Sequence, residues 1–150
     1  MPVSPQRQLD SFIDRYTPAI ATLARACLKK MRACRPGATQ LVYDNYNALV
    51  IGFGPSGKPS EAIFSLVLYP RWVSLFFLRG SDLPDPKKLL RGSGSRVRHV
   101  VIQEPDDLDQ PVIQSLMNAA LRHAQPTIDP AAPGELIIQS ISAKQRPRRP

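Results

Sequence analysis

The feature that most constrains the fold is a block of closely spaced apolar runs between residues 41 and 78. The runs are rich in β-branched and aromatic residues, which is typical of strands, and they cover 41–43, 48–53, 62–69 and 72–78. Asp44-Asn45 is turn chemistry, and only Pro70-Arg71 separates the last two runs. We therefore expect hairpins in an antiparallel sheet. Because the runs are more apolar than strict alternation requires, at least one face of that sheet should be covered.

Helix start signals precede this block. Ser4-Pro5 and Thr17-Pro18 each place a capping residue before a proline suited to the first helical position. Apolar residues then recur at helical spacing, and Pro36-Gly37 ends the pattern. These signals predict two helices, over about 5–16 and 18–34, or one kinked helix.

After the block, the chain returns to shorter signals. Asp85-Pro86 predicts a short helix over 87–91, ended by a glycine. Alternating residues predict a strand over 96–103, and an apolar stripe predicts a closing helix over 111–124. The order of helices, strand block, helix, strand and helix indicates an α+β fold rather than alternating βαβ units. We expect a mostly antiparallel sheet of about five strands, packed with N-terminal and C-terminal helices.

Sixteen prolines suggest many element boundaries and an irregular end. We expect one α+β domain over 1–125 and a proline-rich, basic extension over 126–150. The segment 135–141 could add one more strand, and 145–150 is expected to be a flexible basic end.

Length and composition bound the class of protein. The chain has 150 residues, 43% of them hydrophobic and 21% charged, which fits one globular domain. No apolar run reaches the roughly 18–20 residues of a membrane span, and the first residues lack the apolar stretch of a secretory signal. Cys27 and Cys34 lie seven apart in one predicted helix, too far for a disulfide. We expect free thiols, a cytoplasmic location and no membrane partner.

The chain is basic, with 20 Lys and Arg against 12 Asp and Glu and a net charge of +8. Such an excess favours anionic partners, although a solvated surface explains it equally well. Six of the basic side chains lie near a Gly-Ser loop at 92–95 whose open N–H groups could help to hold a phosphate or carboxylate. These candidate anion-binding residues are Arg79, Lys87, Lys88, Arg91, Arg96 and Arg98.

Two further segments are candidates for binding. Tyr43, Asn45 and Tyr46 combine ring area with directional polar groups and could line a small-molecule pocket; the alternative is a turn with tyrosines at the edge of the core. The basic tail, 142–150, could associate with nucleic acid through its charge. No aromatic residues are interleaved with the basic residues of that tail, so base stacking is not expected from the tail itself.

An acidic cluster stands against this basic background. Its carboxylates could bind a hard cation, or they could cap the entry to the closing helix, and the cluster comprises Glu104, Asp106, Asp107 and Asp109. The sequence Gly52–Gly57 matches GxGxxG, but no helix follows it, so we interpret it as a hairpin loop rather than a nucleotide site. No catalytic motif appears, and we do not expect an enzyme.

Residues 66–80, 83–94 and 97–102, with the closing helix, resemble the YdhG-like domain family of unknown function over about 9–124. The resemblance implies a compact α+β domain with an antiparallel sheet. One branch of that family is frataxin-like and acts as an intracellular iron chaperone, which would imply iron as cargo, with no other cofactor. Frataxin-like binding uses an acidic surface, whereas this chain is strongly basic.

We expect a small cytoplasmic, non-catalytic domain that binds an anionic or polar ligand, or an unknown protein, as a monomer or homodimer. The alternatives are an iron-binding chaperone and a protein that associates with nucleic acid through its basic surface and tail.

Overall fold

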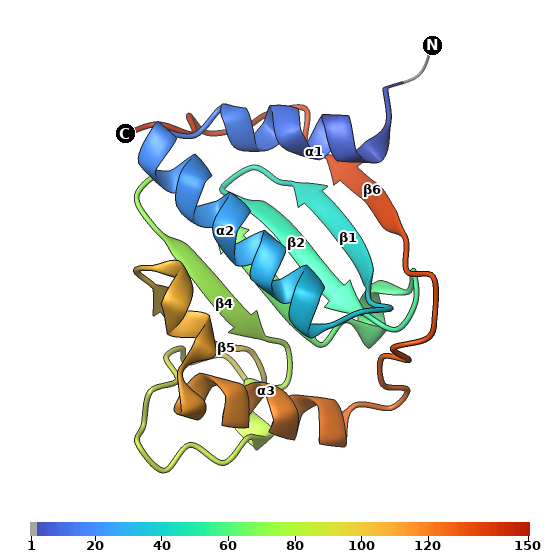
Figure 1. The fold of residues 1–150 in the computed structure, drawn as a ribbon. Helices are drawn as coiled ribbons and strands as arrows, with labels where there is room; N and C mark the ends of the chain where they lie inside the picture. Colours follow the sequence, from blue (N-terminus) through green and yellow to red (C-terminus); the bar gives the residue numbers. More distant parts are fainter. Residues whose placement is uncertain (1–2) are drawn as a thin grey trace.

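A computed structural model describes residues 3–150. These residues form one six-stranded sheet with helices packed against it (Figure 1). The helices are α1 (Pro5–Asp14), α2 (Pro18–Cys34) and α3 (Pro111–His123). The strands are β1 (Thr39–Asp44), β2 (Leu49–Gly54), β3 (Phe64–Leu68), β4 (Val73–Phe77), β5 (Arg98–Ile102) and β6 (Leu136–Ile141). Short 3-10 turns are η1 (Pro59–Glu61), η2 (Gly80–Asp82) and η3 (Pro105–Asp109).

The strand order is β5-β4-β3-β2-β1-β6. Every neighbouring pair is antiparallel except β1 and β6, which run parallel. The predicted α+β class with a mostly antiparallel sheet is therefore confirmed. The described sheet has six strands rather than about five, because the segment around 135–141 pairs with β1.

The two N-terminal helices begin at the predicted caps. The Ser4 hydroxyl accepts a hydrogen bond from the Arg7 N–H at 3.2 Å, and the Thr17 hydroxyl accepts one from the Ile20 N–H at 3.4 Å. A proline follows each cap, where its missing N–H costs nothing. The structure therefore has two separate helices rather than one kinked helix.

All three helices lie over the same face of the sheet. Alternate strand residues such as Leu49, Ile51 and Phe53 join the helices in one apolar core cluster. Residues of the other parity, such as Leu41 and Val67, lie outside that cluster even though they are buried. Figure 1 shows α2 lying across the sheet, with α1 and α3 flanking it. Among residues 3–150, no helix lies on the opposite face of the sheet, here called the open face.

The predicted helix over 87–91 is wrong. Lys88 has a φ of +53°, which a helix does not allow, and the segment is an irregular turn. The Asp85 carboxylate accepts hydrogen bonds from the N–H groups of Leu89 and Leu90, at 2.9 and 2.8 Å. A side chain thus satisfies donors that a single helical turn would leave open, because so short a helix is not stable alone.

Two other sequence expectations can be compared with the structure. Cys27 is buried and Cys34 is exposed, and both thiols are free, as predicted. The glycine-rich segment after β2 is a loop that leads through η1 into β3, so it has no helix to receive a phosphate. No helix in the part of the chain that the structure describes is long and apolar enough to cross a membrane.

Candidate functional site

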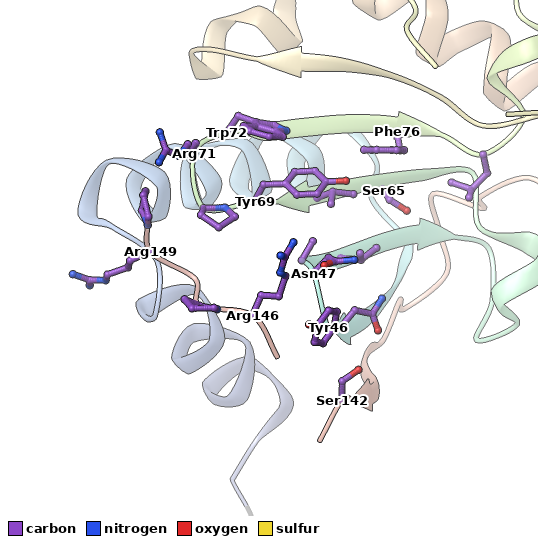
Figure 2. Close-up of a pocket in the computed structure, with 18 residues that line it drawn as sticks. Tyr46, Asn47, Ser65, Tyr69, Arg71, Trp72, Phe76, Ser142, Arg146 and Arg149 are labelled. Atoms are coloured by element: carbon purple, nitrogen blue, oxygen red, sulfur yellow. The ribbon is translucent and has the colours of Figure 1, made fainter. Parts of the chain in front are cut away.

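A wide groove of about 1200 Å³ runs along the open face. Its floor is made by outward-facing strand residues, and its walls come from the β1–β2 turn, the β3–β4 turn and the C-terminal segment 142–150 (Figure 2). Val50, Ser65 and Val67 form part of the floor. We call this hollow the open-face groove.

Aromatic rings dominate one wall of the open-face groove. The Tyr69 N–H donates to the Trp72 carbonyl at 2.9 Å, which closes the two-residue Pro70-Arg71 turn and sets both side chains on the open face. Their ring centroids lie 5.1 Å apart, and 45% of Trp72 is exposed. Phe76 stacks on His99, with centroids 4.8 Å apart and planes 20° apart. The face thus presents flat rings at its surface.

Three arginines line the same groove: Arg71 from the β3–β4 turn, and Arg146 and Arg149 from the C-terminal segment. We call this set the arginine rim. Among residues 3–150, none of the three forms an ion pair, and the groove lining contains no Asp or Glu. The Arg149 Nε donates to the Arg15 carbonyl at 3.1 Å. In the described part of the chain, no Asp or Glu side chain of the lining therefore offsets the positive charge of these arginines.

A buried ion pair holds the C-terminal segment in place. Arg148 is 3% exposed, and its Nη2 lies 2.9 Å from Oδ1 of Asp44, itself 1% exposed. The Arg15 Nη1 lies 3.1 Å from the other carboxylate oxygen of Asp44. Arg148 also donates to the carbonyls of Asn45 and Tyr46. One carboxylate thus joins two guanidinium groups, one from each end of the chain.

Main-chain contacts extend this attachment. The Ser142 N–H donates to the Asp44 carbonyl at 2.9 Å, and the Arg146 N–H donates to the Tyr46 carbonyl at 2.8 Å. The expectation of a flexible end over 145–150 is therefore wrong. The physical reason is that Asp44, the last residue of β1, is buried on the helix-covered side of the sheet. A buried carboxylate requires a group of opposite charge beside it.

Tyr16 lies beneath this ion pair. Its hydroxyl donates to the Leu68 carbonyl at 2.8 Å and accepts from the Leu49 N–H at 3.2 Å. Burial raises the pKa of Tyr16, and nearby Arg148 partly opposes that rise. The hydroxyl therefore stays protonated and joins the link between α1 and α2 to the start of β2 and the end of β3.

The predicted pocket residues lie at or near the open-face groove. Asn45 and Tyr46 line it, and 51% of Tyr46 is exposed. Tyr43 points to the same face by its pairing with Val50, but it does not line the groove, and burial raises its pKa. The turn that carries these residues is thus part of the groove wall.

Of the six predicted anion-binding residues, two line different hollows and one holds its own loop. Arg79 lines a small hollow beside the end of α3, whereas Arg91 lines a separate hollow beside β5. The Arg98 Nη1 donates to the carbonyls of Gly94 and Val97, so it holds its own loop. The side chains of the other three are exposed, and these are Lys87, Lys88 and Arg96.

The acidic cluster has local partners. The Asp107 carboxylate accepts from the N–H groups of Gln103 and Glu104, at 2.8 and 3.2 Å, and so caps η3. The Lys30 ammonium lies 3.6 Å from Asp106 and 2.5 Å from Asp109, and its pKa is raised chiefly by its hydrogen bond to Asp109. Within residues 3–150, no three His, Cys, Asp or Glu side chains are grouped so as to hold a metal ion.

The sequence does not identify most of the residues that line the open-face groove. It predicts a hairpin that contains Arg71, Tyr69, Trp72 and Phe76, but no binding role for them. The sequence signal for these residues is the two-residue alternation of side chains along a strand. It places Tyr69, Trp72 and Phe76 on the same face of the sheet. The side that the helices leave uncovered could not be told from that pattern.

No family model, curated protein or solved structure matches this chain.

Proposed function

We propose that this protein is a non-catalytic binding module that takes a polyanionic ligand in the open-face groove. The observation that carries the proposal is the arginine rim: Arg71, Arg146 and Arg149 line one hollow, and within residues 3–150 none of them forms an ion pair and no Asp or Glu side chain lines that hollow. Guanidinium groups bind phosphate and carboxylate oxygens through paired hydrogen bonds. The rest of the lining offers amides, hydroxyls and rings, which bind and orient a ligand.

We prefer this groove to the basic segment 79–98 because its three arginines line the same hollow. Several charges bind a polyanion well only when they can reach it together. Arg79 and Arg91 line different hollows. The three rim arginines instead share one surface, and the buried Arg148–Asp44 pair keeps two of them in position.

A phosphodiester chain without bases tests this proposal. Binding of a labelled abasic oligonucleotide to the full chain should weaken at least tenfold in the variant Arg71→Gln/Arg146→Gln/Arg149→Gln. The dependence of log affinity on log salt should also flatten by about two units, as expected for three lost phosphate contacts.

The matched control is Lys87→Gln/Lys88→Gln/Arg96→Gln, which removes the same charge from exposed positions outside the groove. This control should keep most of the affinity. Equal weakening in both triple variants would mean that net charge alone drives binding, and the proposed site would be wrong.

A further inference from the structure

We infer that the ligand of the open-face groove is a single strand of nucleic acid. This inference rests on the proposed function, because it names the class of polyanion that the arginine rim would hold. The rim alone suits any polyanion. The rings beside it distinguish a strand with bases from one without.

The first argument is the exposed ring area. Trp72 is 45% exposed and Tyr46 is 51% exposed, although both side chains are large and largely apolar. Exposed rings that gather in one groove mark a candidate contact surface. Unstacked bases are the flat partners that proteins most often place on Trp, Tyr, Phe and His.

The second argument is that rings and guanidinium groups line the same groove. Figure 2 shows Tyr69 and Trp72 on the β3–β4 hairpin, with Arg71 at its turn and Arg146 and Arg149 on the adjacent C-terminal segment. A strand lying along the groove can therefore place its phosphates on the guanidinium groups while its bases lie against the rings. A duplex buries its bases in its own stack and would leave the rings without a partner.

The third argument is size and shape. At about 1200 Å³, the groove is larger than the roughly 300–1000 Å³ typical of a small-molecule pocket, and it is open along the sheet. A mononucleotide would engage only part of it. The amides of the half-buried Asn45 and the exposed Asn47 on the wall add donors and acceptors that suit base edges.

The test compares strands that differ only in their bases. Fluorescence anisotropy of labelled strands of about ten nucleotides would be measured with the full chain, using oligothymidine, oligouridine, an abasic strand of equal length and the matching duplex. We expect oligothymidine or oligouridine to bind about tenfold more tightly than the abasic strand and than the duplex. The comparison of oligothymidine with oligouridine also shows whether the groove prefers DNA or RNA.

Variants separate the contribution of rings from that of charges. Trp72→Leu should reduce the affinity for the base-bearing strand to that of the abasic strand and leave abasic binding unchanged. Trp72→Phe, which keeps a ring, should retain an intermediate affinity. Arg146→Gln should weaken both strands alike.

The outcomes distinguish the two proposals. If bases add nothing and Trp72→Leu has no effect while the arginine variants still weaken binding, the groove binds polyanions but this inference is wrong. If the duplex or thymidine monophosphate binds as tightly as the single strand, the inference is also wrong. If no strand binds, both the inference and the proposed function are overturned.

Discussion

The two faces of the same sheet have opposite characters. On the helix-covered face, Leu49, Ile51 and Phe53 of β2 are sealed in the core. On the open face, Val50 of the same strand is half-buried, and Val101 of β5 is 41% exposed. Neighbouring residues of one strand point to opposite faces of the sheet. The difference in burial between the two faces therefore comes from the helices, which cover only one of them. The covered face stabilises the fold, and the open face is free to bind.

The largest expected effect breaks the covered face. Phe53→Ala removes a fully buried ring and should lower the free energy of unfolding by about 3–5 kcal/mol, since the cavity adds to the lost transfer free energy. The half-buried Phe76 on the open face is the matched control, and Phe76→Ala should cost about half as much or less. Urea unfolding measures both. Similar losses would show that the open face is also a core.

The next effect concerns two neighbouring residues of the C-terminal segment. Arg148→Met removes one partner of the buried Asp44 carboxylate and should cost about 3 kcal/mol, with Arg15 limiting the loss. Arg149→Met changes a rim side chain and should stay within about 0.5 kcal/mol. Urea midpoints of the two variants decide the matter. An Arg148→Met protein as stable as the wild type would mean that the segment is not anchored there.

A smaller effect has the opposite sign. The Ser74 hydroxyl is buried on the open face, and it lacks a hydrogen-bond partner within residues 3–150. Ser74→Ala should therefore raise the free energy of unfolding by about 1 kcal/mol, because an unsatisfied buried group is removed. Ser140→Ala, at an exposed position on β6, is the comparison and should change little. Destabilisation by Ser74→Ala in a thermal melt would imply that the hydroxyl is satisfied.

The smallest effect is a dependence on pH. Burial lowers the pKa of His99, and the charge of Arg91 lowers it further. Because the unfolded chain then takes up the proton first, His99 should reduce stability as pH falls below about 6.5. His99→Gln should flatten this part of the profile, measured as urea midpoints between about pH 7.5 and pH 5. A profile that stays as steep in His99→Gln as in the wild type would contradict the assignment.

Local signals predicted the elements well. Ser4-Pro5 and Thr17-Pro18 specify helix starts through contacts three residues away, so sequence alone was sufficient. The alternation over 96–103 likewise predicted a strand, which the structure places at Arg98–Ile102. The prediction of a helix over 87–91 was wrong because the Asp85 carboxylate binds the N–H groups of Leu89 and Leu90.

The open-face groove depends on distant segments. Tyr46, Trp72 and Arg146 meet there only because the strands pair in one order, with β6 beside β1. Linear charge density instead drew attention to 79–98, where Arg79 and Arg91 line different hollows. Nothing local in the sequence announces that Arg148 is a partner of Asp44, 104 residues away.

That long separation has a consequence for biosynthesis. β1 is made early, yet its outer neighbour β6 and the counter-charge for Asp44 come from residues 136–148. A ribosome-bound chain that has only reached α3 therefore exposes one edge of β1 and an Asp44 carboxylate paired with Arg15 alone. The sheet and its open-face groove can be completed only after residue 148 leaves the exit tunnel, so this protein should acquire its binding surface after translation of nearly the whole domain.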